Sequence, residues 1–82
     1  MIEIDPHGLQ RAAERGATEE EIRSTVEGGD RFPAKFGRVG FRHNFQFDGI
    51  WRGKRYVTKQ IEAYAVEEAG RWIVITVVAK YF

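Results

Sequence analysis

The pattern of apolar and polar positions is most regular at the end of the chain, in residues 71–82. Between Trp72 and Lys80, Thr76 is the only polar side chain. β-Branched residues dominate this segment, which favours a strand over a helix. Both alternating faces are apolar, as in a central strand that is covered on both sides. The expected faces are Ile73, Ile75 and Val77 toward the helices, and Trp72, Thr76 and Lys80 on the opposite side.

The first 30 residues predict two short helices in a tight hairpin. The first helix is expected over 6–15, with Asp5 as its N-cap, a proline at its first position and Gly16 as its C-cap glycine. The second is expected to begin at Thr18, because Thr18 and Glu21 form a capping-box sequence. Two adjacent glycines then end it. Each helix has only a narrow apolar stripe, so both should pack on a sheet by one face.

After residue 30 the apolar period changes from helical to alternating. Strands are expected over 36–47 and 56–66, and residues 2–4 indicate a short additional strand at the start. Turn signals occur at Asp48-Gly49 and over 67–70, with a further bend at Gly53. Sequential hairpins make a sheet antiparallel.

These elements predict the architecture and the place where a ligand would bind. We expect one α+β domain over 1–82, with two N-terminal helices packed on one face of a three- to four-stranded antiparallel sheet. The other face would remain open, and an open face on so small a sheet is where a substrate or partner would sit.

Charge is distributed unevenly, although the formal net charge is only +1. Residues 1–30 carry a net charge of −5, residues 31–59 carry +7, and residues 60–82 carry −1. The middle block interleaves its cations with aromatic residues, a pattern compatible with a polyanion partner. A solvated sheet face balanced by acidic helices would give the same count, so this alternative stays open.

Composition narrows the class of protein further. There is no cysteine, which suits a reducing cytosol and provides no thiolate for a metal. The two histidines stand far apart in the chain, so no metal-ligand spacing and no cofactor motif is found. The opening residues lack the basic and apolar stretches of a signal peptide, and no apolar run is long enough to span a bilayer. We therefore expect a cytoplasmic protein without a membrane segment.

One helix motif resembles a known family. His7, Arg11, Arg15 and Gly16 form the pattern His-x3-Arg-x3-Arg-Gly, and the strand over 72–78 accompanies it. The chain is similar to small bacterial domains of unknown function that are related to toxin RNases of the RelE, ParE and BrnT type. The resemblance implies a RelE-like fold, metal-free RNA cleavage and neutralisation by an antitoxin protein. The resemblance does not fix the type of target, because ParE-type members use the same scaffold against a protein. The family usually has alanine where this chain has Gly8.

The spacing of the motif places its three long side chains on one helix face. A neutral imidazole at His7 could act as general base on an RNA 2′-hydroxyl, while arginine side chains could hold the scissile phosphate. His43 would complement it as general acid. A purely structural role, with the arginines paired to nearby glutamates, remains the alternative. The candidate catalytic residues are His7, Arg11, Arg15, Thr76 and Lys80.

The basic middle block supplies candidates for binding the RNA backbone. Three aromatic residues there, Phe36, Trp51 and Tyr56, could stack on unpaired bases. The candidate nucleic-acid-binding residues are Lys35, Arg38, Arg42, His43, Lys54, Arg55 and Lys59. The sequence thus supports two hypotheses: a metal-free endoribonuclease of the toxin type, or a non-catalytic domain that binds a protein or nucleic acid through the open sheet face.

Overall fold

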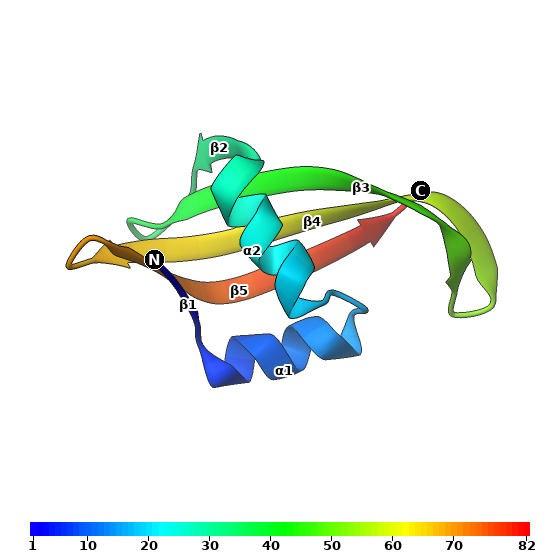
Figure 1. Ribbon diagram of the computed structural model, residues 1–82, viewed down its shortest axis with the longest axis horizontal. Coiled ribbons are helices and arrows are strands. Elements are labelled where there is room, and N and C mark those ends of the chain that lie inside the picture. The colour runs from blue at the N-terminus through cyan, green and yellow to red at the C-terminus, as the bar shows by residue number, and fades with distance from the viewer.

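The computed structural model describes all 82 residues, as two helices on one face of a five-stranded sheet (Figure 1). The strand order is β1-β5-β4-β3-β2. The β3–β4 hairpin extends beyond the end of β5. In chain order the elements are β1 (Ile2–Ile4), α1 (Pro6–Glu14), α2 (Glu19–Gly28), β2 (Asp30–Pro33), β3 (Val39–Trp51), β4 (Lys54–Glu68) and β5 (Arg71–Tyr81).

The prediction of a three- to four-stranded antiparallel sheet of RelE-like form is wrong. The sheet is mixed, because β1 runs parallel to β5, from the pair Ile2 and Trp72 to the pair Ile4 and Val74. It also has an edge strand that the sequence pattern did not reveal, since β2 pairs antiparallel with β3. β2 is only four residues long and contains Pro33. Such a strand has no alternation of its own and forms because α2 delivers it to the edge of β3.

Both helices begin where their capping residues predicted. The Asp5 carboxylate accepts a hydrogen bond from the Gly8 amide at 3.2 Å. Thr18 and Glu21 form the complete capping box, with hydrogen bonds of 2.9 and 3.1 Å. These caps satisfy amides that have no partner within the helix. Neither helix is long and apolar enough to cross a membrane.

The hairpin turns differ from the prediction at one position. β3 continues through Asp48 and Gly49, where the register with β4 shifts, so the turn expected there is wrong. The chain reverses at Arg52 and Gly53, where the further bend was expected; their φ angles are 52° and 80°. Two consecutive positive φ angles are typical of the type I′ turn, which matches the twist of the flanking strands. The same geometry recurs between β4 and β5, within the predicted segment 67–70.

A register shift in β5 changes which side chains face the helices. Tyr64 pairs with Thr76, but the next residue of β4 pairs with Val74, so Ile75 is an extra residue in β5. As a result Val74 and Val77 are both buried on the helix side. Trp72 also packs against this core, edge-to-face with Phe41 at 5.1 Å, which corrects the expectation that it lies opposite the helices.

The core lies between the helices and this side of the sheet. Its buried members come from every layer: Ala12, Ala17, Ile22, Val26, Phe41, Ile61, Ala63, Ala65, Val74 and Val77. The opposite side of the sheet, called the outer face below, carries no helix (Figure 1). It is partly covered by the loop 34–38 between β2 and β3.

Candidate functional site

A polar groove runs between α1 and the tip of the β3–β4 hairpin. It has a volume of about 400 Å³ and no hydrophobic residue in its lining. Three guanidinium groups face a single carboxylate there, so the groove should attract anions. We call this the α1 groove; its lining residues are His7, Gln10, Arg11, Glu14, Arg15 and Arg52.

Close packing of α1 on β5 sets the position of this groove. At Gly8, an added Cβ atom would lie only 2.8 Å from the carbonyl oxygen of Ile75, so the helix approaches the strand where it has no side chain. Arg15 anchors the other end of the helix, because its Nη1 donates to the carbonyl oxygen of Val77 at 2.7 Å. The hydroxyl of Tyr81 donates to the backbone carbonyl of Arg15 at the same distance.

His7 and Arg11 contact each other within the groove. The Nε of Arg11 donates to Nε2 of His7 at 3.2 Å, which only a neutral imidazole can accept. Both side chains are exposed. The pair therefore presents an imidazole and a guanidinium side by side, both exposed to solvent, with the Nε2 lone pair of His7 engaged by Arg11.

Arg52 joins this site because the hairpin folds back onto the helical corner. The neighbouring Trp51 stacks on Tyr81, with ring centroids 4.9 Å apart, and both rings lie close to Gly16. Burial, together with the charge of Glu21, raises the pKa of Tyr81, and the charge of Arg52 opposes this rise. Arg52 was absent from the predicted site, because nothing in its own stretch of sequence indicates that the turn reaches α1.

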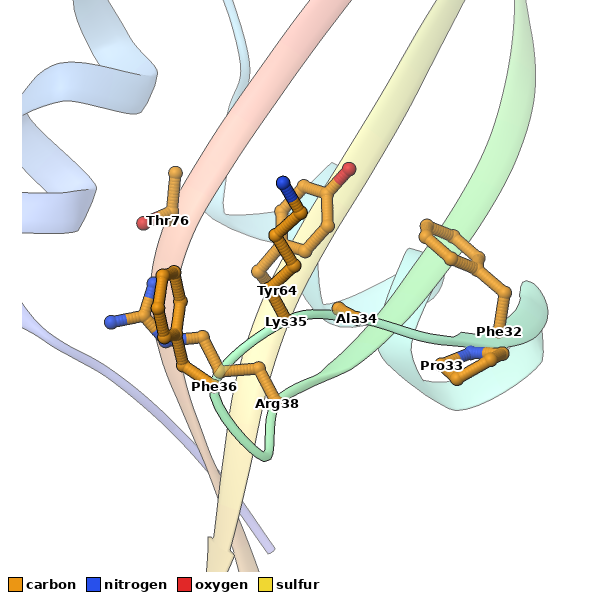
Figure 2. Close-up of a pocket in the computed structure, with 8 residues that line it drawn as sticks. All are labelled: Phe32, Pro33, Ala34, Lys35, Phe36, Arg38, Tyr64 and Thr76. Atoms are coloured by element: carbon orange, nitrogen blue, oxygen red, sulfur yellow. The ribbon is translucent and has the colours of Figure 1, made fainter.

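The outer face holds a second cavity, of about 430 Å³, beneath the loop 34–38 (Figure 2). We call it the outer pocket. Its only charged lining residues are two of the predicted phosphate contacts, Lys35 and Arg38, and both are cations. The complete lining is Phe32, Pro33, Ala34, Lys35, Phe36, Arg38, Tyr64 and Thr76.

A buried carboxylate organises the outer face next to this pocket. Glu62, with its side chain 5% exposed, accepts hydrogen bonds from Arg42 at 2.9 Å, from the Tyr64 hydroxyl at 3.0 Å and from Lys80 at 3.4 Å. Burial by itself would raise the pKa of Glu62, but its bonds with Arg42 and Tyr64 and the charge of Lys80 outweigh burial and lower it. Burial and the bond to Glu62 raise the pKa of Tyr64. The carboxylate thus stays charged and holds both cations in place.

Thr76 connects the two regions of interest. It lines the outer pocket, and it also lines a cavity of about 310 Å³ beside α1 that His7, Arg11 and Arg15 share. Four of the five candidate catalytic residues therefore meet at one edge of β5. Lys80 does not join them, because it binds Glu62 on the outer face.

The remaining candidate nucleic-acid-binding residues are dispersed. Lys54 and Arg55 are exposed at the start of β4, next to the hairpin turn. His43 lies edge-to-face on Phe45 in β3, two strands away from β5, so the structure does not bring it to His7.

Lys59 lies beneath the helices and is already paired. It is 7% exposed, and its ammonium group donates to the Gly16 carbonyl at 2.8 Å and to both Glu21 carboxylate oxygens at 3.1 Å. Because the ammonium group already donates to these oxygens under the helices, it has no free donor directed at a phosphate group. The sequence pattern could not show that Glu21 packs over this strand.

No three His, Cys, Asp or Glu side chains lie close enough together to hold a metal ion. Comparison with known proteins adds no relative: no family model, no curated protein and no solved structure matches the chain. The candidate chemistry of this protein therefore lies in the α1 groove, the outer pocket and the cavity beside α1 that Thr76 borders.

Proposed function

We propose that this protein is a ribonuclease that cleaves single-stranded RNA in the α1 groove without a metal ion. The observation that carries the proposal is the convergence of one neutral imidazole and three arginines in a single exposed groove. A general base next to several phosphate-binding donors is the smallest set of catalytic groups that transesterification of a phosphodiester requires.

In the proposed reaction, RNA supplies its own nucleophile. A 2′-hydroxyl takes the place of Arg11 at Nε2 of His7, which accepts its proton as the O2′–P bond forms. The guanidinium groups of Arg11 and Arg52 then stabilise the charge on the non-bridging oxygens. The P–O5′ bond breaks, water donates a proton to the leaving oxygen, and the hydroxide that remains takes back the proton held by His7. The products are a 2′,3′-cyclic phosphate and a 5′-hydroxyl.

Cleavage of a single-stranded RNA oligonucleotide, with DNA of the same sequence as control, tests the proposal. We expect RNA fragments with 2′,3′-cyclic phosphate ends, produced equally in the presence of EDTA, and intact DNA because it lacks the 2′-hydroxyl. His7→Ala should lower the rate by roughly 10²- to 10⁴-fold. RNA that remains whole at micromolar protein concentration refutes the proposal, as does full activity in His7→Ala with the fold intact.

A matched pair of arginine variants separates the groove from general attraction. Arg52→Ala removes a charge from the groove, and Arg55→Ala removes the same charge from the same hairpin outside the groove. We expect the first to reduce cleavage strongly and the second to act weakly and only at low salt. Equal effects would mean that the hairpin charge matters and the groove does not.

A second candidate function is non-catalytic binding through the outer face. The observation in its favour is the outer pocket, which combines three aromatic rings with two cations. If RNA binds with a steep salt dependence but is never cut, this function replaces the first. In cells, growth arrest with loss of mRNA on overexpression favours the ribonuclease, and a bound antitoxin protein would then cover the α1 groove.

A further inference from the structure

The loop 34–38 carries an aromatic residue in an unusual backbone conformation. Phe36 and Gly37 have φ angles of 61° and 69°, and the Arg38 amide donates to the Lys35 carbonyl at 3.2 Å, as in a type I′ turn. The first central position of such a turn favours Asn, Asp or Gly, and a bulky side chain is strained there. Yet Phe36 is 85% exposed, so the fold gains almost no burial from it. The backbone strain at Phe36 is not offset by buried surface, which indicates that function and not stability requires this residue.

The loop 34–38 is exposed, but the side chains that form the floor of the outer pocket are held by several contacts. Phe32 lies flat across Gly40, where an added Cβ atom would be 2.3 Å from its ring. The Phe32 ring also meets Tyr64 edge-to-face at 5.9 Å, with the Arg42 guanidinium 4.5 Å from its centroid. Tyr64 is fixed in turn by its bond to Glu62. Three aromatic rings, one of them freely accessible, therefore border a single cavity (Figure 2).

The charge around these rings restricts the ligand. Lys35 and Arg38 are the charged lining residues, and the Arg38 guanidinium lies 5.9 Å from the centre of the Phe36 ring. An aromatic surface flanked by cations complements a flat π-system that is covalently joined to an anion. An unpaired nucleotide has this chemistry, because its base stacks on the rings and its phosphate pairs with the cations.

We propose that the outer pocket binds one unpaired base of an RNA strand, with Phe36 as the stacking residue and Lys35 and Arg38 at the adjoining phosphate. Thr76 borders the outer pocket and the 310 Å³ cavity that it shares with His7, Arg11 and Arg15, and it marks where the strand crosses the edge of β5 toward the α1 groove. This inference rests on the proposed function for the identity of the strand as RNA. It adds a subsite that selects unpaired nucleotides, since a base held in a duplex could not enter the pocket.

Binding is tested apart from cleavage by using His7→Ala as the background, so that the RNA survives. Anisotropy of a fluorescently labelled hexa-adenylate measures affinity, and an abasic oligomer of equal length and charge is the comparison. Adding Phe36→Ala should weaken hexa-adenylate binding about tenfold and leave the abasic oligomer unaffected. Adding Val57→Ala, which truncates another exposed apolar residue, should change neither. AMP alone should bind far more weakly than the oligomer if the ligand is a strand and not a free nucleotide.

A second variant keeps the test independent of folding. Phe36→Asn places a residue that the turn favours at this position, so it should raise the melting temperature while weakening hexa-adenylate binding to the same extent. Unchanged affinity in both Phe36 variants overturns the inference, as does an equal loss for the abasic oligomer. If wild-type protein binds as described but cuts nothing, the subsite stands and the ribonuclease fails. If it cuts RNA with no dependence on Phe36, the reverse holds.

Discussion

Replacing Glu62 by glutamine tests whether a buried carboxylate organises the outer face. Glu62→Gln preserves the shape of the side chain. It removes the negative charge that accepts hydrogen bonds from Arg42, Tyr64 and Lys80. The new amide keeps one acceptor oxygen, but its NH₂ group cannot pair with Arg42 or Lys80, because both of these side chains only donate. A hydrogen bond to a charged group contributes about 1.5–3 kcal/mol, and orphaning a buried partner costs more.

The exposure of the two cations limits this cost. The side chains of Arg42 and Lys80 are 43% and 57% exposed, so each can turn toward water when the carboxylate is lost. We therefore expect Glu62→Gln to lower the free energy of unfolding by about 2 kcal/mol at pH 7. With a typical denaturant dependence, this lowers the urea midpoint by roughly 1–2 M. Tyr64→Phe removes one neutral donor and should cost about 1 kcal/mol.

The pH dependence of the difference provides the decisive assay. The pKa of Glu62 lies below its ordinary value of 4.5 in the folded protein, so the folded state binds this proton less readily than the unfolded chain. Its contribution is complete above the unfolded pKa and is lost as the pH falls through the folded pKa. The stability gap between wild type and Glu62→Gln should therefore be constant near pH 7 and close below about pH 4.5. A gap that persists to the acid unfolding limit refutes the reasoning.

Two further substitutions probe the contacts that position the site. Gly8→Ala should destabilise the protein by about 1–3 kcal/mol, as measured by thermal unfolding, because the added Cβ meets the backbone of Ile75; a gain in stability from better helix propensity would contradict this. Lys59→Met should cost about 3 kcal/mol by urea unfolding, since it removes the cation that pairs with Glu21 and the donor to the Gly16 carbonyl. A loss of RNA affinity in Lys59→Met without loss of stability would instead restore Lys59 as a phosphate contact.

Local chemistry explains which elements were predictable from the sequence. The caps at Asp5 and Thr18 depend on residues within three positions of each other, and both form as predicted. The glycine-containing turn at 69–70 is equally local. The short strand indicated over residues 2–4 also forms, although its parallel direction beside β5 was not predicted. By contrast, β2 has four residues and is a strand only because the longer β3 runs beside it. No pattern within three or four residues specifies a distant partner or its direction.

The extra residue in β5 could not be located from the pattern. In a strand that is apolar on both faces, the sequence pattern is the same on either side of a register shift. Nothing at Ile75 therefore indicates that it is the extra residue. The effect is large nevertheless, because it moves Trp72 to the helix side while Thr76 and Lys80 stay on the outer side. Polar residues would have revealed the break in alternation.

The candidate site divides in the same manner. The helical spacing of His7, Arg11 and Arg15 is local, and the structure places the three in one groove. Arg52 is distant in sequence, and only the stacking of Trp51 on Tyr81 brings it there. A search for an aromatic residue next to an arginine in a hairpin turn would have raised it as a candidate, without showing where it lies.

The irregular features of the fold and its candidate chemistry coincide at one edge of β5. Gly8 lets α1 approach Ile75 closely, which brings His7 to the strand, and the extra residue leaves Thr76 next in line on the side where the outer pocket lies. The shift also serves stability, because it buries Val74 and Val77 together and packs Trp72 against the core. The same irregularities place His7, Arg11, Arg15 and Thr76 around one cavity, and Thr76 borders the outer pocket as well. The RNA strand that we propose as ligand would be long enough to contact both cavities.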